Sequence, residues 1–212
     1  EVATLVEAGQ QEIVLSGINL GQWGRDLDPG LRLESLVAAL LRQTALPRLR
    51  LSSVEPTDWS AALTALMAGE PPLARHAHLP LQIGSDAVLR RMRRRYRARD
   101  YAARVEALAA AVPLVAIGAD VMTGFPGETA EEHAETIALL ASLPLAYLHV
   151  FPYSERPGTV SARQVAAGRW QPVPAAVAAE RARELRALDA GKRRGFLQRL
   201  VGLTLPAVML QG

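Results

Sequence analysis

The sequence predicts an α/β fold built on parallel strands, because strand-like and helix-like segments alternate along the chain. Five short apolar segments, each bounded by turn residues, are typical of strands buried on both faces. They lie at 12–16, 48–53, 77–82, 114–122 and 145–151. Segments with apolar residues at helical spacing separate them. Repeated strand–helix–strand units join parallel strands through right-handed crossovers, so we expect the strands to be neighbours in one layer.

The expected helices follow from the spacing of their apolar residues. Four groups recur three or four positions apart: Leu33, Leu36, Val37, Leu40 and Leu41; Leu63, Leu66 and Met67; Tyr101, Val105 and Leu108; Ile137, Leu140 and Ala141. Asp58 is a possible cap for the second of these helices. Prolines predict a loop over 152–174, and 175–202 is typical of a long charged amphipathic helix. Residues 203–210 resemble a strand with no partner in the chain.

Composition limits the possible functions. The chain has 212 residues, of which 50% are hydrophobic, enough for one sizeable core. It has neither a long uncharged apolar run nor a secretory signal, and a cytoplasmic location fits. The absence of cysteine excludes disulfides, thiolate catalysis and cysteine-ligated metals. The pI near 9.8 is typical of proteins with polyanionic partners, although the net charge is only +3 and a GC-rich genome also favours arginine.

Polar or glycine-rich loops follow all five predicted strands. They span 16–24, 52–56, 82–86, 120–130 and 149–159. The carboxyl ends of parallel strands meet at one rim, where α/β proteins carry their sites. We therefore expect these loops to form a binding site together.

Two of these loops precede helices and have two interpretations each. In the loop 123–129, Gly124 and Gly127 allow the backbone to approach a ligand closely, and the helix start favours anions. The loop could equally be a tight turn that a threonine caps. The turn at 84–86 is similar, with Ser85 or Asp86 as the N-cap.

Glu55 and Asn19 are candidate ligand-binding side chains in other rim loops. Glu55 could hold a ribose hydroxyl or an amino group, or pair with a neighbouring arginine. The histidines at positions 76, 78 and 149 have no metal-ligand spacing, and a lone histidine in a strand is more often packed or hydrogen-bonded. The sequence contains no Ser-His-Asp signature, Walker motif or dinucleotide fingerprint, and it predicts no metal site.

Seven arginines occur between Arg90 and Arg99. If this segment is one helix, a single face carries four of them, namely Arg90, Arg93, Arg94 and Arg97. Arginine suits phosphate because its planar fork donates two parallel hydrogen bonds. The run predicts a surface that holds RNA, and the alternative is a solvated helix face.

The rim motifs together resemble those of the radical S-adenosylmethionine methylthiotransferases. They are LSGINLGQWG at 15–24, RLSSVEP at 50–56, HLPLQIGSDAVLRRMRRRY at 78–96, GADVMTGFPGETAEE at 118–132 and LHVFPYSERPGT at 148–159. The last resembles most the branch that modifies N6-threonylcarbamoyladenosine beside the tRNA anticodon. The sister branches, which act on isopentenyladenosine in tRNA or on a ribosomal-protein aspartate, remain alternatives.

The resemblance implies an open, partial TIM-like barrel of the radical SAM type, with about five βα units present and the first strand missing. We expect residues 1–170 to form this barrel, 171–200 a helical segment, and 201–212 the start of an RNA-binding β-barrel. The chain does not begin with Met, so we expect a piece of a longer protein. The cluster-binding cysteine loop and an N-terminal cluster domain would precede it. We expect an exposed edge strand at 11–16 and no activity from this piece alone.

The family's chemistry implies S-adenosylmethionine and two 4Fe-4S clusters in the complete protein, with none bound to this chain. A 5′-deoxyadenosyl radical takes hydrogen from C2 of the adenine, and a methylthio group replaces it. The partner is the tRNA anticodon stem-loop. By position in the barrel, the expected cofactor-binding residues are Gly17, Asn19, Glu55, Gln82, Ser85, Gly124, Phe125, His149 and Phe151. No residue is assigned a catalytic role.

One departure and two further alternatives remain. Ile83 stands where the family usually has serine, which leaves a polar contact near the cofactor in doubt. The complete protein could instead be a relative that binds RNA without chemistry. It could also be an ordinary TIM-type enzyme that holds phosphate on the loop 124–129.

Overall fold

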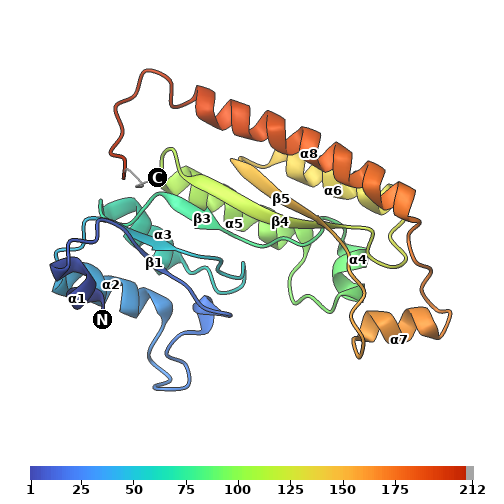
Figure 1. The fold of residues 1–212 in the computed structure, drawn as a ribbon, viewed down its shortest axis with the longest axis horizontal. Coiled ribbons are helices and arrows are strands. Elements are labelled where there is room, and N and C mark those ends of the chain that lie inside the picture. Colours follow the sequence, from blue (N-terminus) through green and yellow to red (C-terminus); the bar gives the residue numbers. More distant parts are fainter. Residues whose placement is uncertain (209–212) are drawn as a thin grey trace.

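The computed structural model describes residues 1–208, and five parallel strands form its centre (Figure 1). β1 (Ile13–Leu15) pairs with β2 (Leu49–Leu51). β3 (His76–His78), β4 (Ala116–Thr123) and β5 (Tyr147–Pro152) pair in that order. Isolated bridges from Leu49 to Leu73 and from Ser53 to His78 connect β2 to the β3 segment. The strands therefore follow chain order in an open arrangement, and the predicted partial barrel is confirmed.

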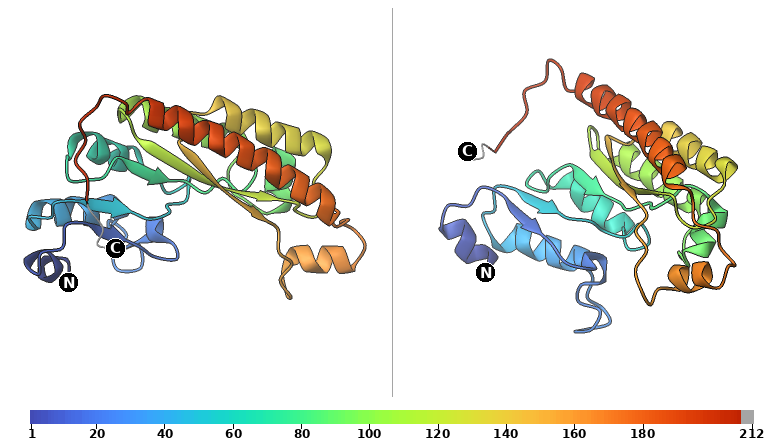
Figure 2. Two further views of the ribbon diagram at one scale, coloured as in Figure 1. Left: turned by 45° about the horizontal axis from the view of Figure 1, so that its top comes forward. Right: turned by 45° about the vertical axis from the view of Figure 1, so that its right-hand side comes forward.

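Helices connect successive strands, and further helices precede the first strand and follow the last one (Figure 2). Their bounds are α1 (Val2–Glu7), α2 (Leu33–Gln43), α3 (Ala61–Gly69), α4 (Asp86–Arg91), α5 (Ala98–Ala111), α6 (Ala130–Ser142), α7 (Val160–Ala166) and α8 (Ala175–Gln198), with a short 3₁₀ turn at Leu20–Gln22. The buried core contains most residues of the predicted apolar faces, although Ala141 is exposed. Leu33 and Val37, for example, are at most 1% exposed.

The start of α3 differs from the prediction. Ser60, not Asp58, is its N-cap, and the Ser60 side chain accepts a hydrogen bond from the Leu63 amide at 3.0 Å. Asp58 instead binds Arg25 at 2.9 Å, with Gln22 as a further partner. It thus ties the glycine-rich loop after β1 to the start of the α3 segment.

The long helix α8 covers β5, whose single strand partner among residues 1–208 is β4. The Leu148 amide of β5 donates to the Asp189 carboxylate of α8 at 2.6 Å, so a free backbone donor at the sheet edge is satisfied. Lys192, the sole lysine, donates to the carbonyls of Ala141 and Leu143 at the end of α6. A cation at that position also suits the negative end of the helix dipole.

The segments on either side of α8 differ in part from the prediction. The proline-rich stretch contains α7, which Thr159 caps through a hydrogen bond from the Ala162 amide. Residues 203–208 have no regular secondary structure, and 209–210 lie outside the described residues. The predicted division at 170 and 200, and the start of a β-barrel at 201, remain predictions. Among residues 1–208, no helix is long and apolar enough to cross a membrane.

Candidate functional site

The open face of the sheet carries alternate side chains of β4 and β5. In β4, Ile117, Ala119 and Val121 are fully buried against the helices. Their neighbours point to the other face, because successive side chains of a strand alternate. The register pairs Asp120 with His149 and, one step nearer the rim, Met122 with Phe151.

Five polar side chains on three strands form what we call the polar floor: His76, His78, Asp120, Tyr147 and His149. Nε2 of His78 lies 3.0 Å from Oδ1 of Asp120, and Nδ1 of His149 lies 3.4 Å from the same oxygen. The Tyr147 hydroxyl lies 2.9 Å from Nε2 of His76 and 3.0 Å from Nδ1 of His78. One continuous set of hydrogen-bonded groups therefore crosses the open face.

Gly118 makes room for this arrangement. A Cβ atom at Gly118 would overlap the ring of Tyr147, which lies across β4. The glycine is thus required by a close approach and not by its backbone angles.

Three members of the polar floor have shifted pKa values, and burial raises that of Tyr147. Burial alone would raise the pKa of Asp120, but the hydrogen bond from His78 and the charge of the two imidazoles outweigh it, and the pKa is lowered. Burial, with Arg50 and His78 nearby, lowers the pKa of His76 to about 4, so His76 is neutral near pH 7.

The polar floor also forms a cluster with metal-binding potential that the sequence did not indicate. One ligand atom each from His78, Asp120 and His149 lie within 4.8 Å of one another. Sequence spacing could not reveal this cluster, because the three residues are on different strands. Only the register of β3, β4 and β5 brings them together.

Gln82 occupies a strained position at the rim. Its φ is 72°, a left-handed conformation that residues other than glycine rarely adopt. Two hydrogen bonds to β4 hold it there, from its amide to the Asp120 carbonyl at 2.8 Å and from the Met122 amide to its carbonyl at 2.7 Å. Such outliers concentrate at functional sites. A cavity of about 280 Å³ lies beside Gln82, lined also by Met122 and Phe125.

The other expected cofactor-binding residues differ in their exposure to solvent. Gly17 and Asn19 are exposed in the loop after β1. Ser85 is fully buried, and its hydroxyl has no hydrogen-bond partner among residues 1–208. Phe125 is 6% exposed and packs edge-on against Tyr153. The ring of Phe125 is thus part of the core as well as of the cavity wall.

Glu55 pairs with an arginine, one of the two interpretations of the sequence. Arg94 Nη1 lies 3.3 Å from both carboxylate oxygens of Glu55. Both side chains are about one third exposed, at 35% for Glu55 and 32% for Arg94. This pair connects the second rim loop to the turn after α4.

The arginine run is not one helix, so the predicted common face for Arg90, Arg93, Arg94 and Arg97 is wrong. α4 ends at Arg91, and Arg93 has a φ of 58°. The amide of Arg94 bonds the Leu89 carbonyl at 2.9 Å, which makes Arg93 the left-handed residue of a Schellman motif. Asp86 accepts from the Ala98 amide at 2.7 Å and fixes the start of α5 beside α4.

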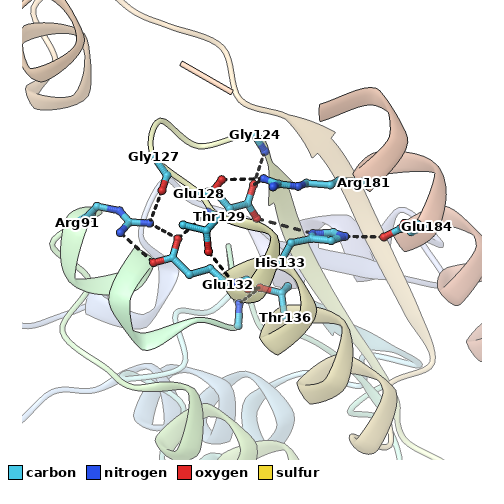
Figure 3. A network of polar contacts seen from close by, with 11 residues as sticks. Arg91, Gly124, Gly127, Glu128, Thr129, Glu132, His133, Thr136, Arg181 and Glu184 are labelled. Atoms are coloured by element: carbon cyan, nitrogen blue, oxygen red, sulfur yellow. Dashed lines mark hydrogen bonds and ion pairs between the residues drawn. The ribbon is translucent and has the colours of Figure 1, made fainter. Parts of the chain in front are cut away.

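The loop between β4 and α6 is a tight turn whose own carboxylates occupy its amides (Figure 3). The Gly124 amide donates to Glu128 at 2.9 Å, and the Thr129 amide donates to Glu132 at 2.9 Å. Thr129 and Glu132 form a capping box, which confirms the capping interpretation of this turn. Two carboxylates already hold these amides, so the alternative of a phosphate site on this loop is disfavoured.

Ion pairs connect this loop and the start of α6 to α4 and α8 (Figure 3). Arg91 of α4 binds Glu132. Arg181 of α8 donates to the Glu128 carboxylate at 2.9 Å and to its carbonyl at 3.0 Å. The contact with Glu128 raises the pKa of His133 against the effect of burial, and Glu184, at 2.8 Å from His133, acts in the same direction.

Proteins of known family resemble this chain. The sequence profile of the Radical SAM superfamily matches residues 1–140. The threonylcarbamoyladenosine tRNA methylthiotransferase MtaB of Aquifex aeolicus is 35% identical over 212 residues, which are 100% of this chain and 50% of that protein. The tRNA-2-methylthio-N(6)-dimethylallyladenosine synthase of Streptomyces viridosporus is 36% identical over 212 residues, 100% of this chain and 41% of that protein. The chain thus spans half the length of these relatives or less.

Solved structures share the fold at low sequence identity. The archaeal Elp3 of Methanocaldococcus infernus superposes with a TM-score of 0.57 at 13% identity, over 87% of this chain and 46% of that one. Coproporphyrinogen III oxidase of Escherichia coli, described as a radical SAM enzyme, gives a TM-score of 0.55 at 16% identity, over 90% and 39% of the two chains. At such identities the likeness concerns the fold alone.

Proposed function

The chain belongs to the radical SAM superfamily, and from this we propose that it is the central part of a tRNA methylthiotransferase whose substrate is N6-threonylcarbamoyladenosine. The main support is that two tRNA methylthiotransferases match the entire chain, at 35% and 36% identity. These relatives differ in the adenosine that their names specify. Sequence identity does not separate them, so the choice between the substrates depends on the side chains of the site.

The residues of this chain fit the two expected cofactors differently. The chain has no cysteine, so it supplies no thiolate to an iron–sulfur cluster, and no step through a cluster follows from it. S-adenosylmethionine, when bound to a reduced cluster in this superfamily, supplies the radical that starts the reaction. We propose that Gln82 and the cavity beside it hold part of this cofactor. The strained backbone of Gln82 would then keep its side chain at one position on the rim.

The threonylcarbamoyl substrate is favoured by the chemistry of the open face. A threonylcarbamoyl group carries N–H donors, a hydroxyl and a carboxylate, whereas a dimethylallyl group is a hydrocarbon. The open face below Met122 and Phe151 is lined by imidazole, carboxylate and phenol groups. Burying a hydrocarbon over the accessible parts of Asp120 and His149 would remove their contact with water without offering a partner, at a cost of about 1–3 kcal/mol each.

For tRNA, we propose that the exposed arginines near α4 contact phosphates. Arg90 and Arg93 are exposed, and neither makes an ion pair within residues 1–208. Replacing both with alanine in the complete protein should weaken tRNA binding. It should also reduce the slope of log affinity against log salt by about one unit per lost phosphate contact. The measurement is tRNA affinity over a salt series.

A matched control is Arg194→Ala with Arg199→Ala. Both arginines are exposed near the C-terminal end of α8, and that end of the helix lies well away from α4 (Figure 1). This pair removes the same charge and should leave the slope unchanged. If the two double variants have equal slopes of log affinity against log salt, the arginines near α4 do not contact tRNA and form only a solvated surface.

A strain that lacks the gene tests the proposed function in the cell. Its tRNA should contain N6-threonylcarbamoyladenosine without the methylthio group, as measured by mass spectrometry of its nucleosides. The modification should return when the gene is supplied on a plasmid. If the dimethylallyl nucleoside loses its methylthio group instead, the enzyme class holds and the proposed substrate does not.

A further inference from the structure

Among residues 1–208, two ring nitrogens of the polar floor have no hydrogen-bond partner: Nδ1 of His76, which is buried, and Nε2 of His149, which belongs to an exposed side chain. His78 uses both ring nitrogens, one for the Tyr147 hydroxyl at 3.0 Å and one for Asp120 at 3.0 Å. His149 places Nδ1 at 3.4 Å from Asp120, and its Nε2 has no hydrogen-bond partner within the described part of the chain. The His149 side chain is 57% exposed, so this free nitrogen is accessible at the open face.

The surroundings of His149 change from apolar to polar with distance from the rim. Met122 and Phe151 are paired in register one step nearer the rim, and Asp120 and His149 are paired behind them. Asp120 remains 27% exposed although two imidazoles bind it. A ligand that fits this order has a flat apolar body and a polar arm.

We propose that Asp120 and His149 bind the polar N6 substituent of the adenosine and thereby select a threonylcarbamoyl over a dimethylallyl group. This inference rests on the proposed function. In it, Asp120 accepts a hydrogen bond from an N–H of the carbamoyl group, and His149 donates one to the threonyl carboxylate. Met122 and Phe151 hold the base by apolar contact and stacking.

The shape of adenine agrees with this assignment. Atoms C2 and C6 flank N1, so their substituents leave the ring along different edges. When C2 faces the cofactor at the rim, the N6 substituent can extend along the open face toward Asp120 and His149. A dimethylallyl group at the same place would cover the free nitrogen of His149 without offering it a partner.

A divalent cation is the competing ligand for these residues, since His78, Asp120 and His149 have ligand atoms within 4.8 Å of one another. The structure favours the substituent because His78 and Asp120 are already bonded without an ion. The free nitrogen, moreover, belongs to the most exposed of the three side chains.

The test is a competition between two substrates. The complete protein with its clusters receives equal amounts of tRNA bearing N6-threonylcarbamoyladenosine and tRNA bearing N6-dimethylallyladenosine, and mass spectrometry follows both methylthio products. His149→Phe should lower the ratio of the two rates, threonylcarbamoyl over dimethylallyl, by about tenfold or more, as expected for one lost hydrogen bond to a charged group. His149→Gln retains a donor and should lose less.

Arg194→Ala, which changes an exposed arginine of α8 without a hydrogen bond or ion pair among residues 1–208, serves as the control and should leave the ratio unchanged. Circular dichroism melting shows whether each variant is folded. If the wild type modifies neither tRNA, the proposed function fails and this inference fails with it. If the wild type prefers the threonylcarbamoyl substrate and His149→Phe keeps the same ratio, only this inference is overturned.

A second measurement tests whether these residues bind a divalent cation instead of the N6 substituent. Calorimetric titration of this cysteine-free chain with Zn²⁺ should show no tight binding at the polar floor. Tight binding that His149→Phe abolishes would assign the three side chains to a cation and overturn the proposal.

Discussion

Replacing Arg181 with methionine is expected to lower the free energy of unfolding by about 3–5 kcal/mol, because it removes the closest cation from a buried carboxylate. The side chains of Arg181 and Glu128 are 9% and 1% exposed. Arg181 also bonds the Glu128 carbonyl, at 3.0 Å. Its loss should loosen the loop that begins at Gly124, whose amide bonds the same carboxylate. Urea unfolding of the chain measures the loss.

Two further variants check the cause of this effect. Arg186→Met changes an exposed arginine of the same helix and should shift stability by less than about 0.5 kcal/mol. Adding Glu128→Gln to Arg181→Met removes the uncompensated charge and should recover part of the loss. If Arg181→Met costs no more than Arg186→Met, the buried pair does not hold α8 to the loop.

Gly118→Ala is the substitution with the second-largest expected effect. The new Cβ would overlap the ring of Tyr147, and two histidines hold the hydroxyl of that ring in place. Overpacking of a buried site costs about 1–3 kcal/mol, and we expect the upper end because His76, His78 and Arg193 all contact the ring of Tyr147. Thermal and urea unfolding of the Gly118→Ala variant would measure the loss of stability.

The cause can be tested by removing the ring. In a Tyr147→Leu background, Gly118→Ala should cost much less, so the two substitutions should be strongly coupled. Gly191→Ala is the control, since a Cβ there meets nothing within 4 Å. Because Gly191 lies inside α8, alanine should stabilise the helix by about 0.5–1 kcal/mol. A loss at Gly118 that is the same with and without the Tyr147 ring would contradict the overlap.

The strands and the longer helices could be predicted because the spacing of apolar residues within each segment indicates which of them are buried. Leu33 and Val37 are buried on α2, as the spacing indicates. The break after α4 could not be predicted, since it depends on a left-handed Arg93 and on a hydrogen bond between Asp86 and Ala98. Arginine has good helix propensity, so the local sequence favours a continuous helix. The hydrogen bond from the Ala98 amide to Asp86 favours the turn between α4 and α5 instead.

The candidate site could be predicted at its rim and not at its floor. The rim loops follow the strands directly, so parallel topology alone places them together. The polar floor depends on register, which pairs Asp120 with His149 and His78 with Gly118. Sequence spacing carries no information on register between strands whose connections differ in length. For that reason the sequence does not indicate Asp120 as a site residue and predicts no contact between the histidines.

The most direct test of the account is the activity of the purified complete protein on its proposed substrate. The protein with reconstituted clusters is incubated without oxygen with S-adenosylmethionine and tRNA bearing N6-threonylcarbamoyladenosine, and the nucleosides are analysed by mass spectrometry. We expect a product that carries a methylthio group on the adenine of that nucleoside. Intact clusters, cleavage of S-adenosylmethionine and an unmodified tRNA would together contradict the account.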